Sequence, residues 1–454
     1  MGTSPCAMTK SWGRRALRLI DSVVAAIIVL VAIPLLVIAR LLVRRFGPAR
    51  RDVVVSLTAD TIADTRRLNT PEGLARFYGR DPLVRTYVVH AGIESTTARR
   101  LGPGVIGIEA VLPWPGVIAP ILPITTRVVN ELFGVVAAIR LLRRVGGNVI
   151  EVMSPSAMVP RALLAQWLSG CRLTTQVRGN IDLLSHSLGA YFYCRIRSAW
   201  LIPQLFAGAV HTLIVEAFYR RCALVVGYNL NNLQSAISNG ADPSRSRLAR
   251  IAIDRAILEA PEVARDALPG FPKTGRVILL WSRLGPEKYV SEALEAFIDL
   301  AATHLDVSLV TIGDGPTRAA LESRAQAAGL AERALFLGYR DHGFIRSAGA
   351  CADIALVPYG GSSLVEAVLL DLPVVAFDVE WHAELIRNGE TGFLADFPDP
   401  RHLATQLRAA LDDPDEARRM ARACRAVADR MFDPARVRAD ERRFYEALLR
   451  HPAA

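Results

Sequence analysis

The chain has 454 residues, 51% of them hydrophobic, which is enough for two domains that each bury a core. Its formal net charge is +10, but residues 1–51 hold nine basic side chains against one acid, Asp21, and so carry +8 of that charge. Clustered arginine beside an apolar run indicates contact with anionic lipid and argues against nucleic-acid binding. The six cysteines form no CxxC pair and no metal-ligand spacing, so no metal site is expected.

Residues 22–39 form an uncharged apolar run with basic residues on both flanks. As a helix the run would rise roughly 27 Å, against ~30 Å for the hydrocarbon core of a bilayer. Pro34 favours a kink within it. Residues 15–45 resemble the membrane segment of the monotopic bacterial phosphoglycosyl transferases. We therefore expect residues 20–45 to anchor the chain at the cytoplasmic face of a bacterial inner membrane, either as a re-entrant helix or as a single span.

After Arg51, short apolar segments alternate with segments of helix length, which is typical of a parallel α/β sheet. Six strands are predicted in a first series, over 52–58, 84–90, 105–111, 148–154, 173–177 and 223–228. The clearest helices between them are predicted over 125–144 and 157–169. Residues 240–275, rich in Asp, Pro, Gly and Arg, indicate a domain boundary.

A second series of predicted strands covers 276–282, 307–313, 334–339, 354–359 and 373–378. Predicted helices lie between and after them, over 287–303, 316–328, 362–370 and 401–411. The pattern predicts an anchor over 1–51, an α/β domain over 52–262 and a second over 263–435. A helix over 436–454, with the option of crossing back to the first domain, completes the expected organisation.

Four motifs follow one another in the second series. They are WSRLGPEKYVSEALEAF, VTIGDGPTRAALE, PYGGSSLVEAVLLDLPVVAFD and VEWHAELIRNGETGFLAD. In order and spacing they resemble the donor domain of glycosyltransferase family 4, a retaining, metal-independent family. The resemblance implies the GT-B fold, in which two Rossmann-like domains face a cleft.

The first motif contains Arg283 at the end of a predicted strand and Lys288 near the start of a helix. The resemblance implies that both cations hold the diphosphate of a nucleotide-sugar donor and act catalytically. A departing nucleoside diphosphate accumulates negative charge, which fixed cations stabilise. The family has a glycine after this lysine, where the chain has Tyr289.

The second and third motifs supply further donor-binding candidates, because a tight turn or a helix start can receive the donor. The resemblance assigns phosphates to the helix start and ribose hydroxyls to the glutamate. The candidates are Gly313, Gly315, Gly361, Ser362, Ser363, Leu364 and Glu366. Two positions depart from the family: Pro358 replaces a glutamate that contacts the donor sugar, and Asp371 replaces a glycine.

The fourth motif places Glu384 and Gly392 at matching positions, while Trp381 and His382 stand where the family has small residues. We expect Glu384 to order the loop behind the donor site. His382 can either contact the donor sugar or only pack. In the first half of the chain, Arg178 and Asn180 follow a predicted strand and are candidates for contacts with phosphate and sugar at the cleft.

Together these features predict transfer of a sugar from a nucleotide sugar to a polyprenyl- or other lipid-linked acceptor, in surface polysaccharide or glycolipid synthesis. No cofactor or metal is expected, and no Asp-x-Asp motif follows a strand. Two alternatives stay open. One is a sugar-nucleotide epimerase, and the other is a non-catalytic scaffold of a polysaccharide assembly complex.

Overall fold

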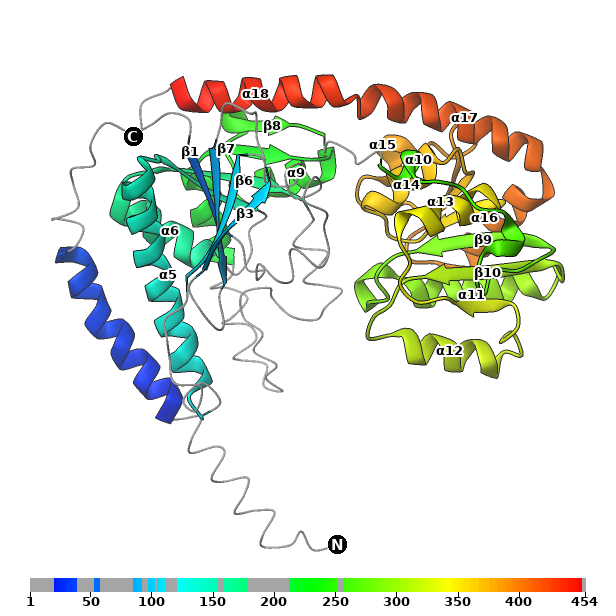
Figure 1. Cartoon of the computed structure of the whole chain (residues 1–454), viewed down its shortest axis with the longest axis horizontal. Helices are drawn as coiled ribbons and strands as arrows, with labels where there is room; N and C mark the ends of the chain where they lie inside the picture. Colours follow the sequence, from blue (N-terminus) through cyan, green and yellow to red (C-terminus); the bar gives the residue numbers. More distant parts are fainter. Residues whose placement is uncertain are drawn as a thin grey trace, which may run out of the picture.

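In the computed structural model, the described residues are 20–38, 53–57, 85–91, 97–102, 104–110, 121–153, 158–178, 212–250 and 256–450. They form two α/β domains, an N-terminal helix beside the first domain, and a long helical connection that joins the domains along one side (Figure 1).

The first domain is built on an eight-stranded sheet of order β3-β4-β2-β1-β5-β6-β7-β8. Its strands are β1 Val53–Leu57, β2 Arg85–Ala91, β3 Thr97–Gly102, β4 Val105–Ala110, β5 Val149–Met153, β6 Arg172–Val177, β7 Cys222–Gly227 and β8 Ser246–Leu248. All pairs are parallel except β3 with β4, which is antiparallel. Described helices that pack on this sheet include α5 Pro123–Val145, α6 Val159–Ser169, α9 Leu230–Ser238 and a helix over 212–221.

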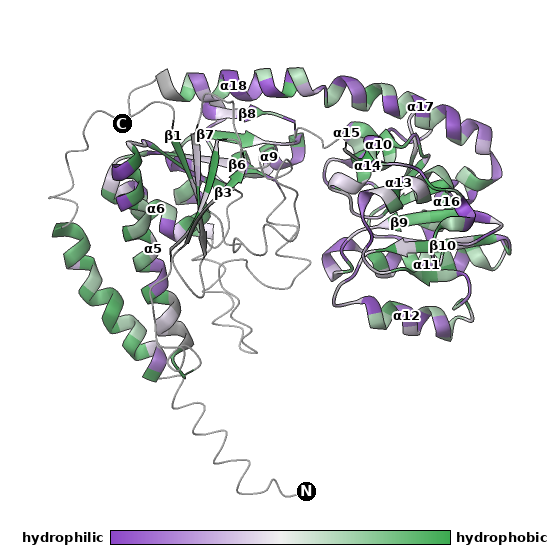
Figure 2. Ribbon diagram, viewed as in Figure 1, coloured by the Kyte–Doolittle hydropathy of each residue, from purple (hydrophilic) through white to green (hydrophobic). Residues whose placement is uncertain are grey.

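The N-terminal helix, Ile20–Ile38, is long and apolar enough to cross a membrane. It lies beside α5 (Figure 1), and Figure 2 shows apolar residues along most of it. Its buried Asp21 accepts a hydrogen bond from the backbone N–H of Thr125, in the first turn of α5, at 2.9 Å. Its remaining surface exposes many large apolar side chains, Leu30 and Leu35 among them.

The second domain has a six-stranded, fully parallel sheet of order β11-β10-β9-β12-β13-β14. Its strands are β9 Arg276–Trp281, β10 Val307–Ile312, β11 Ala334–Phe336, β12 Ile354–Val357, β13 Val374–Phe377 and β14 Phe393–Ala395. Alternate residues of β9 enter different cores: Ile278 and Leu280 enter one, and Val277 and Leu279 enter the other. A sheet covered on both faces explains its nearly continuous apolar strands.

The helices of the second domain run from α10 to α17. They are α10 Ala256–Glu259, α11 Val290–Ala301, α12 Arg318–Ala327, α13 His342–Ala350, α14 Ser362–Leu369, α15 His382–Leu385, α16 Pro400–Asp412 and α17 Pro414–Met431. The expected fold of two Rossmann-like domains is confirmed. Helix α18, Pro434–Arg450, packs on the first domain, where the hydroxyl of Tyr445 contacts Glu151.

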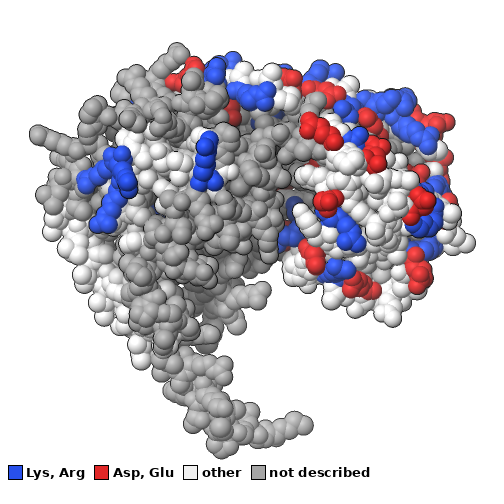
Figure 3. Space-filling model, viewed as in Figure 1, with Lys and Arg blue, Asp and Glu red and all other residues white. Residues whose placement is uncertain are grey.

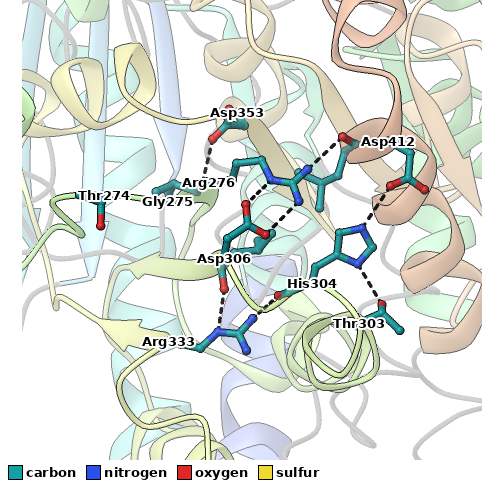
Figure 4. A network of polar contacts seen from close by, with 12 residues as sticks. Thr274, Gly275, Arg276, Thr303, His304, Asp306, Arg333, Asp353 and Asp412 are labelled. Atoms are coloured by element: carbon teal, nitrogen blue, oxygen red, sulfur yellow. Dashed lines mark hydrogen bonds and ion pairs between the residues drawn. The ribbon is translucent and has the colours of Figure 1, made fainter.

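A polar network fixes the amino edge of the second sheet (Figure 4). Arg276, the first residue of β9, donates two hydrogen bonds to Asp306 at 2.9 and 3.0 Å and one to the carbonyl of Leu411 at 3.0 Å. These hydrogen bonds lower the pKa of the Asp306 carboxyl. The four sequence motifs lie at the opposite, carboxyl edge of the same sheet.

Candidate functional site

The four motifs of the second domain meet at one edge of its sheet. They follow the carboxyl ends of β9, β10, β12 and β13, which are neighbours in the order β10-β9-β12-β13. In parallel α/β sheets this edge is where ligands bind. The structure therefore brings together candidate residues that are far apart in the sequence.

Arg283 and Lys288 lie in the loop between β9 and α11. The Arg283 side chain is exposed and forms an ion pair with the buried carboxylate of Glu287. Lys288 ends a short 3₁₀ turn, and its Nζ lies 4.9 Å from the centre of the Tyr359 ring. Burial lowers the pKa of Lys288. A partly desolvated ammonium over an aromatic ring is a strong site for an anion.

The turn after β10 brings two glycines against the loop that carries Arg283. Gly313 has a φ of 135°, and a Cβ atom there would lie 1.9 Å from the backbone oxygen of Ser282. At Gly315 a Cβ atom would lie 2.2 Å from the backbone oxygen of Leu284. Both glycines are therefore required for the two loops to pack together, whatever their contact with a ligand.

Helix α14 begins with unoccupied backbone donors. Its N-cap is Gly361, and no side chain caps the helix start. A Cβ atom at Gly361 would meet no atom within 4 Å, so the space beside it is open. Ser362 is exposed and Ser363 half-buried, whereas the Leu364 side chain is fully buried and leaves only its backbone for a ligand. This start has the geometry of an anion site.

Glu366 lies one turn further along α14 and is oriented by β9. The indole N–H of Trp281 donates a hydrogen bond of 2.7 Å to its Oε2 atom. This contact joins the third motif to the first and leaves the other carboxylate oxygen for a further partner. The apolar pattern RVILLW places Trp281 in a predicted strand, but nothing in that pattern indicates its hydrogen bond to Glu366.

His382 is buried rather than open to the cleft, with 1% of its surface exposed. Its Nε2 accepts a hydrogen bond from the backbone N–H of Gly360 at 3.0 Å, and its Nδ1 lies 2.7 Å from the carbonyl oxygen of Phe377. Since the carbonyl only accepts, the proton is on Nδ1. The ring thus positions the glycine loop before α14, which agrees with the packing alternative for His382.

The pH dependence of stability provides a test of this role. Burial lowers the pKa of His382 to about 4, below the unfolded value near 6.5. The unfolded chain therefore binds the proton first as the pH falls, and stability is lost between about pH 6.5 and pH 4. We expect this loss to be about 2–3 kcal/mol, measured by urea unfolding. In His382→Gln the loss should shrink by that amount. An unchanged pH slope would contradict the buried neutral imidazole.

Three non-glycine residues of the described chain have positive φ angles: Tyr289 at 52°, Asp371 at 58° and Glu380 at 51°. Tyr289 and Asp371 stand where the family motifs have glycine. Asp371 is stabilised by an ion pair of 3.2 Å with Arg425. The family glycines therefore mark left-handed backbone positions, which this chain keeps with larger side chains.

Asp371 offers a direct test, since its side chain is exposed and makes few contacts. A β-branched residue is strained at positive φ, whereas glycine is not. We expect Asp371→Gly to unfold within about 0.5 kcal/mol of the parent chain and Asp371→Val to lose about 1–2 kcal/mol. Chemical denaturation measures both. Equal stability of the two variants would show that the turn has no left-handed requirement.

Glu384 has a different place from the one expected. Its carboxylate accepts a hydrogen bond of 2.7 Å from the backbone N–H of Leu230, at the start of α9, and forms an ion pair of 2.6 Å with Arg250. Both partners belong to the first domain. Glu384 thus joins the two domains, and its role in ordering the loop behind the donor site stays a prediction. Sequence gave no signal for this, because the partners are distant in the chain.

Arg178 lies at the carboxyl end of β6 in the first domain. It donates a hydrogen bond of 2.8 Å to Oε1 of Gln176 and one of 3.0 Å to the hydroxyl of Tyr228. Gln176 in turn contacts Glu151 and Tyr445 of α18. The arginine is therefore held in place by neighbouring strands. Asn180 lies outside the described residues.

Comparison with known families assigns the second domain. Residues 266–427 match the family model of glycosyl transferases group 1. The second domain is a group 1 glycosyl transferase domain. Among the residues that the structure describes, no group of three or more His, Cys, Asp or Glu side chains could hold a metal ion.

The curated relatives that match this domain are named for different acceptors. The chain is 34% identical over 187 residues to the phosphatidyl-myo-inositol mannosyltransferase of Mycobacterium leprae, covering 40% of this chain and 49% of the relative. It is 30% identical over 207 residues to the 2-deoxystreptamine glucosyltransferase of Streptomyces kanamyceticus, covering 44% and 51%. The chain thus spans about half the length of these relatives.

Solved structures extend the likeness to both domains. Anabaena Alr3699/HepE, in complex with UDP and glucose, matches 87% of this chain and 99% of its own with a TM-score of 0.63 at 16% identity. WaaG, a glycosyltransferase involved in lipopolysaccharide biosynthesis, matches 85% and 98% with a TM-score of 0.59 at 15% identity. These likenesses establish the GT-B fold for the two α/β domains.

Within the glycosyl transferase domain, sequence reasoning missed two residues near Lys288. Tyr359 lies under the Lys288 ammonium and is hydrogen-bonded to Glu380, and this carboxylate raises the pKa of the tyrosine together with burial, the larger cause. Tyr359 belongs to the PYGGSS motif and Glu380 to the fourth motif. Only the fold shows that these positions meet.

Proposed function

We propose that the chain transfers a sugar from a nucleotide-sugar donor to a membrane lipid-linked acceptor, in the synthesis of a surface polysaccharide or glycolipid. The observation that carries this proposal is the shared sheet edge on which Arg283, Lys288 and the uncapped start of α14 lie. Two cations and a helix N-terminus on one edge suit a diphosphate.

The leaving diphosphate gives these residues their chemical role. When the bond between sugar and diphosphate breaks, negative charge develops on the diphosphate oxygens. Lys288, partly desolvated beside Tyr359, stabilises this negative charge most strongly. Arg283 contributes further stabilisation when its guanidinium contacts the diphosphate as well as Glu287. The free N–H groups at Gly361–Ser363 orient the phosphates.

The nucleoside and the sugar have separate candidate partners. Glu366, held at one oxygen by Trp281, accepts hydrogen bonds from the ribose hydroxyls with the other. The Gly313–Gly315 turn borders the base. Glu380 supplies a carboxylate toward the donor sugar, beside Lys288 and Tyr359, in place of the glutamate that Pro358 removes. We expect transfer with retained configuration and without a metal.

The acceptor side rests on the first domain and the N-terminal helix. That helix exposes an apolar surface suited to a bilayer, and the basic residues around it suit anionic lipid at the cytoplasmic face. Arg178, held by Gln176 and Tyr228, is available to a phosphate of donor or acceptor. A relative that acts on a phosphatidyl-myo-inositol acceptor supports a lipid acceptor.

Binding of nucleotides tests the donor site. Glu366→Gln removes the carboxylate charge but keeps an acceptor for the Trp281 N–H. We expect it to weaken the binding of the preferred nucleoside diphosphate about tenfold or more, because hydrogen bonds to charged groups contribute about 1.5–3 kcal/mol. Calorimetry with UDP, GDP and ADP measures this in detergent. Glu390→Gln, at an exposed position, is the control. Unchanged affinity in Glu366→Gln would remove Glu366 from the site.

A further inference from the structure

Three neighbouring strands of the first sheet open on an arginine. Arg172 is the first residue of β6, Arg221 directly precedes β7, and Arg245 directly precedes β8. Because these strands are parallel and adjacent, their amino ends meet at one edge of the sheet. That edge is opposite the carboxyl edge at which Arg178 and the Arg250–Glu384 contact lie.

A cavity of about 460 Å³ occupies this amino edge. A fourth arginine, Arg247, joins the other three in its lining, and α18 closes it with Phe444, Ala447 and Leu448. Among the described residues of the lining there is no Asp or Glu. On the face drawn in Figure 3, by contrast, acidic and basic side chains are interspersed over the second domain and along α17 and α18.

Three of these arginines, Arg221, Arg245 and Arg247, keep donors for a ligand. Arg221 donates from Nη1 to the carbonyl oxygen of Ala217 at 3.1 Å, and Arg247 from Nη1 to that of Ser246 at 2.8 Å. Arg245 has one carboxylate neighbour, Asp242, at 3.5 Å. A guanidinium has five N–H donors, so these contacts leave several of them open. Arg172 is 9% exposed and supplies a charge at the cavity wall.

From this arrangement we propose a second ligand site, separate from the donor site, that binds a phosphate or diphosphate group joined to an apolar chain. The arginine forks match phosphate oxygens, and the wall of Leu173, Leu224, Phe444 and Leu448 suits the apolar part. The volume falls within the ~300–1,000 Å³ typical of ligand pockets. Because α18 follows directly on α17 of the second domain, both halves of the chain contribute to the site.

The N-terminal helix points toward the same edge. It starts at the first turn of α5, through Asp21 and Thr125, and runs beside that helix (Figure 1). Helix α5 ends at Val145, just before β5 begins at Val149, so both helices lead to the amino edge of the sheet.

The test uses the full chain in detergent with Lys288→Met as background, so that the donor site does not dominate anion binding. The probes are farnesyl diphosphate and inorganic pyrophosphate, and calorimetry measures the affinity of each. The test variant combines Arg221→Gln, Arg245→Gln and Arg247→Gln. The control variant removes three charges from exposed positions elsewhere, by Arg387→Gln, Arg422→Gln and Arg430→Gln. Melting temperatures check that both variants fold.

We expect farnesyl diphosphate to bind at least tenfold more tightly than pyrophosphate, and its affinity to fall at least thirtyfold in the test variant but less than threefold in the control. Equal loss in both variants, or no binding of either probe, would overturn the proposal. Flotation with phosphatidylglycerol in phosphatidylcholine vesicles identifies the source. A dependence on phosphatidylglycerol that the test variant loses points to a lipid headgroup, and binding of farnesyl diphosphate without that dependence points to a soluble diphosphate.

Discussion

Replacing Lys288 with methionine is expected to lower kcat about 100- to 1,000-fold, with little change in melting temperature or a small rise. The loss of activity follows from removing a fixed charge at the point where the leaving diphosphate becomes negative. The retained melting temperature follows from the burial of the Lys288 side chain. Burial lowers the pKa of Lys288, so the folded protein stabilises its charge less well than water does, and an apolar side chain of similar length suits the same space.

Steady-state kinetics and thermal unfolding of the same preparation measure both effects. Lys273→Met, at an exposed position far from the four motifs, is the matched control and should leave both quantities unchanged. An active Lys288→Met protein would remove the lysine from catalysis. An inactive and unfolded one would mean that Lys288 is needed for structure, and would contradict its assignment as a buried cation kept for function.

Gly313→Ala is expected to destabilise the second domain by about 4 kcal/mol or more, the largest stability effect predicted for this site. The new Cβ atom would lie 1.9 Å from the backbone oxygen of Ser282, and the φ of 135° is closed to alanine. Backbone on both sides of the contact cannot move away as a flexible side chain would.

Gly361→Ala is the informative comparison, because its Cβ atom would meet nothing within 4 Å. We expect it to cost about 1 kcal/mol or less in stability. It should nevertheless weaken nucleotide binding, since the methyl group occupies the open space at the start of α14. Urea unfolding and calorimetry on both variants separate the two kinds of glycine. A destabilised Gly361→Ala with normal nucleotide affinity would mean that this glycine serves packing alone.

Much of the fold could be predicted from sequence because its strands are buried on both faces. Segments such as RVILLW and VSLVTI are mostly apolar, and the structure has β9 and β10 there. Strands β3, β8 and β14 were not predicted. Strand β3, TARRLG, pairs antiparallel at the sheet edge and is not apolar, and β8 and β14 have only three residues each. All three stand at an edge of their sheet, where strands are often short or polar and leave little periodic pattern in the sequence.

The site residues also fall into a part that could be predicted and a part that could not. The motifs located Arg283, Lys288 and Glu366, because local turns and a helix start leave local patterns. Contacts between distant segments left none: Trp281 with Glu366, Glu380 with Tyr359, and Glu384 with the first domain. The left-handed angles of Tyr289, Asp371 and Glu380 were likewise hidden, since these residues do not carry the signature of glycine.

Transfer of sugar by the detergent-solubilised full chain is the measurement that tests the central claim most directly. The donors are a panel of nucleotide sugars, the acceptor is a polyprenyl-linked extract, and Lys288→Met and Glu366→Ala proteins are assayed in parallel. We predict a glycosylated lipid with retained anomeric configuration, formed equally well with a metal chelator and lost in both variants while they stay folded. No transfer and no donor hydrolysis with any nucleotide sugar, together with no nucleotide binding, would contradict the account and favour a scaffold.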